Sequence, residues 1–183
     1  LLDNINTYID DINELISQVV DFSKLNASKQ EDEISLYQTI KVAAFIESRI
    51  IATKCEESRK VVRQIDHTIE LTTNPAYLRL LIDNLLKNAA IHSKCQIFVS
   101  LNNLNGYTEL VVEDDGEGIP DEYIDLIFIP FSRLDVSRSR TTGGLGLGLA
   151  ISKAACNRMS SQLAVEKNRK VGAKFTCRFL KSD

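Results

Sequence analysis

Three glycines at alternate positions, Gly144, Gly146 and Gly148, form the strongest chemical signal in the sequence. Because glycine has no Cβ, a polyphosphate could lie directly against the main-chain N–H groups of such a segment. The apolar and alanine-rich residues that follow predict a buried helix, and the positive end of its dipole favours an anion at this point. The segment suggests nucleotide binding, although other nucleotide folds also use glycine-rich turns.

Two common phosphate-binding motifs do not fit these glycines. A P-loop continues with Gly-Lys-Ser/Thr, whereas Leu149 and Ala150 follow Gly148 here. A dinucleotide fingerprint needs its third glycine one residue later and a strand directly before the first. The preceding residues, 138–142, are polar and basic, so both motifs fail on spacing.

A second candidate for chemistry is the pair Asn84 and Asn88, four residues apart in a predicted helix and therefore on one helical face. The leucines between them should turn toward the core. A carboxamide oxygen can bind Mg²⁺, a hard cation that shares its remaining coordination sites with water and phosphate. An isolated pair of this kind more often caps or solvates a helix.

An acidic segment lies between these two motifs. Asp114 ends a predicted strand and is followed by Asp115, Gly116 and Gly118. An ionised carboxylate here could accept a hydrogen bond from the exocyclic amine of adenine and so discriminate against a base without that donor. A hydrogen bond to a charged group contributes about 1.5–3 kcal/mol. Taken alone, the same residues also read as a common acidic turn.

The elements that must position these residues follow from the hydrophobic pattern. Asn74 and Pro75 are a good helix start, and Asn105-Gly106 favours a tight hairpin turn. The sum is an α+β fold in which helices cover one face of a mixed sheet. The predicted helices cover residues 1–25, 38–55, 75–91 and 147–158, and the predicted strands cover 34–36, 60–65, 68–71, 96–101, 108–112, 162–165 and 174–179.

Composition limits the classes of function. The chain has 183 residues and a net charge of −3, with no basic stripe that would favour nucleic acid and no apolar run as long as a membrane span. Its four cysteines are scattered without a C-x-x-C pair, as expected of reduced thiols in a cytosolic compartment. The chain begins inside a helical pattern, which we interpret as a piece cut from a longer protein.

The first helix carries a long apolar stripe with alternating steps of three and four residues, typical of a coiled coil or bundle. Further apolar residues widen the stripe and favour a four-helix bundle. The alternative is an ordinary helix that lies on its own domain. A polar stretch, 26–32, follows as a linker or turn. The stripe consists of Leu2, Ile5, Ile9, Ile12, Ile16 and Val19, and the widening residues are Leu1, Tyr8, Leu15 and Phe22.

In this order and spacing, the motifs resemble those of the ATP-binding domain of sensor histidine kinases of two-component systems. The resemblance covers the chain from about residue 32, and residues 1–25 resemble the second helix of that family's dimerisation and phosphoacceptor hairpin. It implies a GHKL, Bergerat-type α/β sandwich, with a hairpin helix and linker at 1–29 and a catalytic domain at 30–183. The matching motifs are the N box at 84–93, the first glycine box at 114–118, the phenylalanine box at 127–131, the second glycine box at 144–148 and the Gly-x-x-Phe strand at 172–175.

The resemblance also implies ATP and Mg²⁺ as cofactors. Asn88 corresponds to the metal ligand, with Asn84 beside it, and Asp114 to the acceptor of the adenine amine. Arg133 joins the two asparagines as a catalytic residue in a lid at 120–143, where arginines could neutralise charge during transfer or simply be solvated. The other implied ATP-binding residues are His92, Gly116, Gly118, Ile119, Phe131, Arg138, Arg140, Thr142, Gly144, Leu145, Gly146, Leu147 and Gly148.

Asn84 bears on the type of reaction. Hydrolases that share this ATP fold carry a Glu where this chain has Asn84, and a carboxamide cannot act as a base for water. Transfer to a side chain of another domain therefore fits better, helped by positioning and charge neutralisation. Neither His67 nor His92 has the sequence setting of a phosphoacceptor, so we expect the chain to lack its phosphorylation site.

Two departures keep alternatives open. The family often has Lys or Arg where this chain has Ile91, and a polar residue where it has Ile129. The alternatives are a nucleotide-binding pseudokinase and a GHKL protein-serine kinase. For the intact protein the resemblance implies a homodimer through the hairpin helix, a response-regulator receiver domain as partner and no nucleic acid. It also implies a cytoplasmic location, with membrane contact only through a missing N-terminal region of a bacterial inner-membrane protein.

Overall fold

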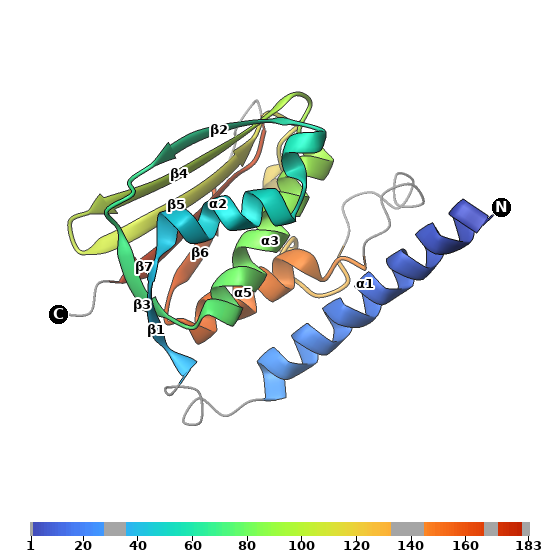
Figure 1. Cartoon of the computed structure of the whole chain (residues 1–183), viewed down its shortest axis with the longest axis horizontal. Coiled ribbons are helices and arrows are strands. Elements are labelled where there is room, and N and C mark those ends of the chain that lie inside the picture. The colour runs from blue at the N-terminus through green and yellow to red at the C-terminus, as the bar shows by residue number, and fades with distance from the viewer. Residues whose placement is uncertain (1, 28–35, 133–144, 167–171, 181–183) are drawn as a thin grey trace.

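The computed structural model describes residues 2–27, 36–132, 145–166 and 172–180 (Figure 1). Short 3-10 turns occur at Cys55–Glu57 and Asp121–Tyr123. The helices are α1 (Leu2–Ala27), α2 (Val42–Ala52), α3 (Pro75–His92) and α5 (Gly148–Arg158), and the strands are β1 (Gln38–Lys41), β2 (Lys60–Ile65), β3 (Glu70–Thr73), β4 (Gln96–Leu104), β5 (Tyr107–Asp114), β6 (Gln162–Val165) and β7 (Lys174–Leu180).

The strands form a five-stranded mixed sheet in the order β2-β4-β5-β7-β6 and a separate two-stranded sheet of β1 and β3. β2 runs parallel to β4, and the other neighbours are antiparallel. The tight turn between β4 and β5 falls at Asn105-Gly106, as predicted, and Gly106 has a φ of 89° that favours glycine.

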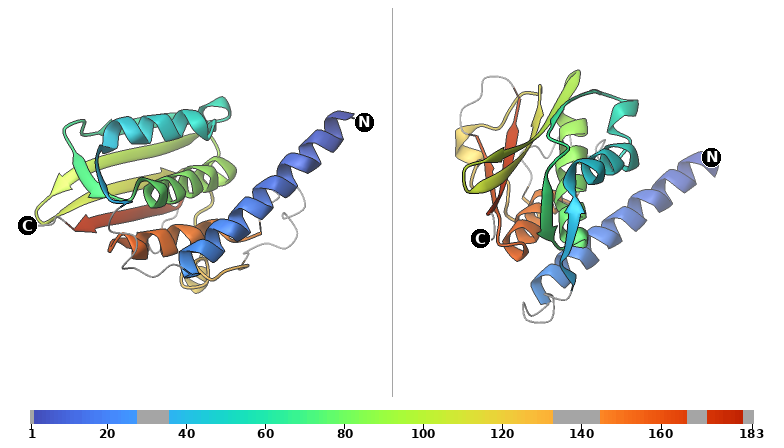
Figure 2. Two further views of the ribbon diagram at one scale, coloured as in Figure 1. Left: turned by 60° about the horizontal axis from the view of Figure 1, so that its bottom comes forward. Right: turned by 60° about the vertical axis from the view of Figure 1, so that its left-hand side comes forward.

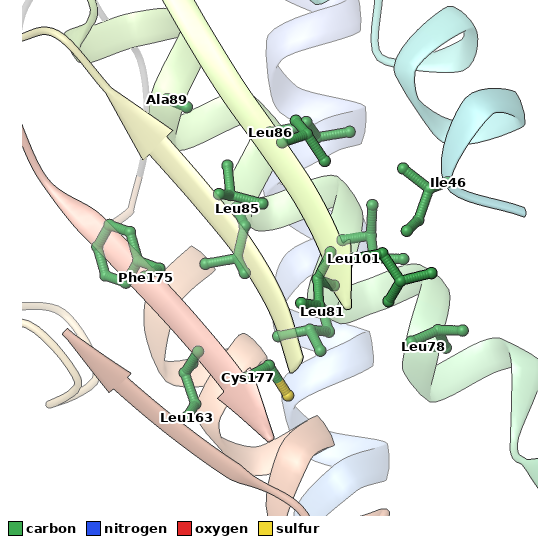
Figure 3. Close-up of a cluster of buried hydrophobic side chains, with 14 of the residues drawn as sticks. Ile46, Leu78, Leu81, Leu85, Leu86, Ala89, Leu101, Leu163, Phe175 and Cys177 are labelled. Carbon is green, nitrogen blue, oxygen red and sulfur yellow. The ribbon is translucent and has the colours of Figure 1, made fainter. Parts of the chain in front are cut away.

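Helices α2, α3 and α5 lie on one face of the large sheet, as the two views of Figure 2 show. The core fills the space between these helices and the sheet. Side chains from both layers contribute to it, such as Ile46, Leu81, Leu101 and Phe175 (Figure 3). The predicted α+β sandwich with helices on one face of a mixed sheet is confirmed.

α3 carries the asparagine pair and begins where the sequence predicts. The Asn74 side chain accepts a hydrogen bond of 2.9 Å from the Ala76 N–H, and Pro75 occupies the first turn. α3 is buried over a wider face than predicted, because it packs against the sheet and also against α2 and α5. Ile91 was expected on the buried face but is 49% exposed, whereas Ala89 in the same turn is buried in the core, so Ile91 lies on the outward face of α3.

One prediction near the N-terminus is wrong: the helix expected at 38–55 begins at Val42 and ends at Ala52, and Gln38–Lys41 form a strand instead. The cause is pairing with a distant segment: β1 lies antiparallel to β3, with Gln38 opposite Thr73. Such non-local pairing leaves little signal in a mostly polar four-residue strand. Of the strand expected at 34–36, residues 34 and 35 lie outside the described residues.

α1 contacts the rest of the chain through its C-terminal end. Leu25 is buried and packs with α5, and Phe22 is half-buried in the same cluster. The last two turns of α1 therefore lie on the helix's own domain, as the alternative interpretation expects. The apolar stripe remains outward in its described part, where Ile9, Ile12, Ile16 and Val19 are all about half exposed.

Within the described ranges, no helix combines the length and apolar character needed to cross a membrane. Polar and acidic residues occupy the other faces of α1.

Candidate nucleotide-binding site

Asp114 is the last residue of β5, and its side chain is only 4% exposed. Strand alternation puts it on the core face together with Leu110 and Val112. Its carboxylate Oδ1 accepts hydrogen bonds from the N–H of Gly116 at 2.8 Å and the N–H of Ala173 at 3.3 Å. Among the described residues both bonds reach Oδ1, so Oδ2 keeps acceptor capacity for a ligand.

Burial raises the pKa of the Asp114 carboxyl above its ordinary value, because desolvation disfavours the charged form. The N–H groups of Gly116 and Ala173 and the nearby His92 lower this pKa, but by less. The carboxylate is therefore a strong acceptor in a poorly solvated position. This is the setting in which one hydrogen bond discriminates well between bases.

The main chain around Asp114 is packed too closely for side chains at two glycines. A Cβ on Gly116 would lie 2.3 Å from the carbonyl oxygen of His92, at the end of α3. A Cβ on Gly172 would lie 1.6 Å from the Asp114 carbonyl oxygen, and the Gly172 N–H donates to the Gly116 carbonyl at 2.9 Å. The first glycine box, the end of the N box and the Gly-x-x-Phe strand therefore meet at Asp114.

The asparagine pair meets the second glycine box at the first residue of α5. A Cβ on Gly148 would lie 3.1 Å from Oδ1 of Asn84, and Nδ2 of Asn84 donates to the Leu80 carbonyl at 2.8 Å. Asn84 thus contacts the N-terminal end of α5, where unpaired N–H groups favour an anion. Asn88 is half-buried one turn further along α3.

The phenylalanine box approaches the second glycine box through the main chain. The Phe131 N–H donates to the Gly146 carbonyl at 3.1 Å. Both residues have positive φ, 65° for Phe131 and 72° for Gly146. This hydrogen bond joins the two ends of the segment that carries the predicted lid. The end at Gly146 is packed into the fold, because Leu147 is fully buried and Leu145 is half-buried beside it.

The remaining predicted residues fall into two groups. Gly118 has a φ of 82°, Ile119 packs against the main core, and the His92 side chain is exposed. The others lie outside the described residues, and they are Arg133, Arg138, Arg140, Thr142 and Gly144.

Sequence reasoning missed one residue that is tied into this site. The carboxylate of Asp115 accepts main-chain N–H groups of Lys94 and Cys95, in the turn after α3. Strand alternation places Asp115 on the opposite side from Asp114, but the sequence carries no signal for its partners. The two neighbouring acids therefore have different surroundings.

Comparison with known proteins assigns the chain to a family. Residues 73–183 match the family described as histidine kinase-, DNA gyrase B-, and HSP90-like ATPase. This match extends over more than half of the chain, and the chain belongs to this family. The predicted ATP-binding fold class is therefore confirmed.

Relatives are named sensor kinases. Sensor protein RstB of Escherichia coli is 42% identical over 95 residues, which are 52% of this chain and 22% of RstB. Signal transduction histidine-protein kinase ArlS of Staphylococcus aureus is 29% identical over 181 residues, 96% of this chain and 40% of ArlS. The chain thus spans less than half the length of these curated relatives.

Solved structures share the fold. Acinetobacter baumannii histidine kinase AdeS superposes with a TM-score of 0.78 at 17% identity, covering all of this chain and 84% of AdeS. Mycobacterial sensor histidine kinase MprB gives 0.68 at 22% identity, covering 79% of this chain and 97% of that one. These likenesses show the fold, while the family match and the named relatives identify an ATP-binding catalytic domain of the sensor histidine kinase type, as the motifs predict.

Proposed function

We propose that this chain transfers the γ-phosphoryl group of ATP to a histidine that lies on another helix of the same protein. The buried Asp114 carboxylate carries the proposal, because it is oriented by two N–H groups through Oδ1 and retains Oδ2 as an acceptor. Oδ2 would accept the exocyclic amine of adenine. Guanine has a carbonyl at the corresponding position and would meet the carboxylate with repulsion.

The triphosphate would lie along the second glycine box. Gly148 opens an eleven-residue helix whose first N–H groups lack intrahelical partners. Gly146 has no Cβ that would separate its main chain from a ligand, which supports binding through main-chain N–H groups, while the missing Cβ of Gly148 leaves room for Asn84. The arginines predicted in the lid, Arg133 among them, would neutralise charge on the transferred group.

Asn88 would hold Mg²⁺ together with phosphate oxygens. Its carboxamide oxygen is a hard ligand of the kind that Mg²⁺ accepts, and Mg²⁺ usually takes only one or two protein ligands beside phosphates and water. Among the described residues there is no cluster of three His, Cys, Asp or Glu side chains for an independent metal site. When bound, the ion would supply charge neutralisation between the phosphates.

Asn84 favours transfer over hydrolysis. Its carboxamide lies against Gly148 and donates to the Leu80 carbonyl, and a carboxamide has no basic pKa with which to activate water. Among the described residues the histidines are His67, exposed in the turn after β2, and His92, whose carbonyl packs on Gly116. His67 lies far from the glycine boxes in sequence, and His92 lies near Asp114 on the proposed adenine side of the site, which supports an acceptor outside this chain.

The partners follow from the same proposal. The exposed stripe on α1 would pair with the first hairpin helix and with a second copy in a homodimer. The phosphohistidine would then pass its phosphoryl group to an aspartate of a response-regulator receiver domain. The domain would work in the cytoplasm of a bacterial cell, joined to an inner-membrane sensor through residues that precede it.

The first experiment measures ATP-analogue binding by calorimetry for wild type, Asp114→Asn and Asp66→Asn. Asn keeps an oxygen for the N–H groups of Gly116 and Ala173 but presents an NH₂ group to adenine. We expect at least tenfold weaker binding for Asp114→Asn, since a hydrogen bond to a charged group contributes about 1.5–3 kcal/mol, with an unchanged circular dichroism spectrum. Asp66 accepts from Thr68 in a distant turn, and its variant should bind as wild type does. Unchanged affinity of Asp114→Asn would remove the adenine assignment.

A second experiment separates kinase from nucleotide-binding module and from protein-serine kinase. The chain is mixed with a fragment that carries the first hairpin helix, Mg²⁺ and labelled ATP. Acid-labile label on that fragment supports histidine transfer, and acid-stable label indicates serine. Binding of ATP without any label indicates a pseudokinase. Asn88→Asp should reduce the transfer rate, and a wild-type rate would clear Asn88 of the metal role.

A further inference from the structure

Asp115 turns its carboxylate away from the nucleotide site and toward the turn between α3 and β4. Its Oδ1 accepts the N–H of Lys94 at 2.8 Å and the N–H of Cys95 at 3.1 Å, and its Oδ2 lies 3.1 Å from the same Cys95 nitrogen. These are hydrogen bonds to an ionised acceptor, which are stronger than those between neutral groups. The carboxylate thus anchors the segment after β5 to the segment after α3.

The turn between α3 and β4, which Asp115 binds, is also hydrogen-bonded to the start of β2. Nε of Arg59 donates to the Ser93 carbonyl at 3.0 Å and to the Ser93 hydroxyl at 2.8 Å, and the Lys60 N–H donates to the Cys95 carbonyl at 3.0 Å. The carbonyl groups of the turn therefore bind to the start of β2, while its N–H groups bind to Asp115. Because the turn after α3 is hydrogen-bonded on both sides, it can fix the position of Asp115.

The residue after Asp115 orients the adenine acceptor. The N–H of Gly116 donates to Oδ1 of Asp114 at 2.8 Å, and the absence of a Cβ lets Gly116 lie against the His92 carbonyl. Gly116 has no side chain whose packing could keep it there. Its position depends on its neighbours along the chain and on the Gly172 N–H, which reaches its carbonyl at 2.9 Å.

We propose that Asp115 is a positioning residue for ATP binding: by accepting the N–H groups of Lys94 and Cys95, it holds Gly116 where the Gly116 N–H orients the Asp114 carboxylate. This inference rests on the proposed ATP site. It adds a residue that touches no part of the nucleotide but sets the direction of the group that reads the base.

Loss of the Asp115 carboxylate should disturb the base side of the site and spare the phosphate side. α3 is held by buried side chains, including Leu85, Leu86 and Ala89, so Asn88 keeps its place without Asp115. A misdirected Asp114 weakens binding of ATP equally in the ground state and the transition state, and this raises KM without changing kcat. A smaller folded fraction would instead lower the apparent kcat and leave KM unchanged.

The experiment compares Asp115→Ala, Asp115→Asn and the matched control Asp66→Ala. Oδ1 of Asp66 also accepts two hydrogen bonds, but within its own turn: the Thr68 N–H at 2.9 Å and the Thr68 hydroxyl at 2.6 Å. The Asp66 N–H pairs with the Leu101 carbonyl, whereas Asp114 pairs with Ile97. Asp66 is therefore displaced by four residues along β4, about 13 Å at the rise of a strand.

We expect Asp115→Ala to raise the dissociation constant of a non-hydrolysable ATP analogue, and the KM for ATP in the transfer assay, by about tenfold, with kcat within twofold of wild type. Asp115→Asn keeps one acceptor oxygen and should restore part of the affinity. Asp66→Ala should stay within twofold in all three quantities. All variants are compared at a temperature where circular dichroism shows each to be fully folded.

Wild-type affinity for Asp115→Ala would overturn the inference, as would a fall in kcat at constant KM or an equal loss of affinity in Asp66→Ala. These outcomes differ from failure of the proposed function itself. If wild type binds the analogue and Asp114→Asn does not, the ATP site stands whatever Asp115 does. If wild type fails to bind the analogue, the proposed function falls and takes this inference with it.

Discussion

The guanidinium of Arg158, in the last turn of α5, donates two hydrogen bonds to the main-chain carbonyl of Leu25, from Nε at 2.9 Å and from Nη2 at 2.5 Å. The carbonyl groups in the last turn of a helix such as α1 have no intrahelical partners. Arg158 therefore completes the C-terminal end of α1. The other end of α5 begins at Gly148, against Asn84, so one eleven-residue helix contacts both α1 and the candidate nucleotide site.

Replacing Arg158 should loosen α1 while leaving the sheet intact. We expect Arg158→Ala to lower the free energy of unfolding by about 1.5 kcal/mol, because the carbonyl loses a charged donor in a partly buried place. Amide hydrogens in the last two turns of α1 should exchange faster, as measured by mass spectrometry. Arg79→Ala is the control, since Arg79 is 47% exposed and lies 3.8 Å from Asp83, and such pairs contribute little. Unchanged exchange in α1 would show that Leu25 packing alone holds the helix.

Two glycines with positive φ offer a test of packing against backbone strain. Gly106 has a φ of 89°, and none of the described residues comes within 4 Å of the point where a Cβ would lie. At Gly172, with a φ of 74°, a Cβ would lie 1.6 Å from the Asp114 carbonyl oxygen. Gly106→Ala should cost about 1–2 kcal/mol from the left-handed backbone alone. Gly172→Ala should cost about 3 kcal/mol or more, because the crowded main chain must also move. Urea denaturation measures both, and equal losses would mean that the close packing at Asp114 relaxes freely.

Local signals in the sequence were enough for the elements that carry the site. Asn74 and Pro75 start α3 at the predicted residue, and Asn105-Gly106 turns β4 into β5, because capping and turn chemistry act over a few residues. The glycine and asparagine motifs then lie on α3, β5 and α5, which the sheet brings together. Alternation along β5 also puts Asp114 on the core face.

Contacts between distant segments could not be predicted. β1 forms because Gln38–Lys41 pairs with β3, about 30 residues later in the chain. The residues of β1 themselves show no apolar alternation that would predict a strand. Asp115 binds Lys94 across 21 positions and Arg158 binds Leu25 across 133. Each of these depends on where the completed fold leaves unpaired main-chain groups, which no local pattern encodes.

The adjacent acids Asp114 and Asp115 should affect stability in opposite directions as the pH changes. Burial raises the pKa of Asp114 in the folded state. For Asp115, desolvation also raises the pKa, but the main-chain N–H groups around Cys95 outweigh it and the net shift is downward. For Asp114, the raised folded-state pKa means that ionisation costs the folded protein free energy above that pKa. For Asp115, the lowered folded-state pKa means that the ionised carboxylate stabilises the fold above the pKa of the unfolded chain.

Urea denaturation at pH 7 and near pH 3 tests both signs in single variants. Asp114→Asn should raise the free energy of unfolding at pH 7, and the gain should disappear below about pH 4, where the carboxyl is protonated in both states. Asp115→Asn should lower the free energy of unfolding at pH 7, and its loss should shrink as the pH falls through the folded-state pKa. Asp114→Asn therefore separates the two roles of this carboxylate, since it should fold better and bind ATP worse. If Asp114→Asn is instead less stable than wild type at pH 7, its hydrogen bonds outweigh the cost of burying its charge, and the site is built for stability as well as for binding.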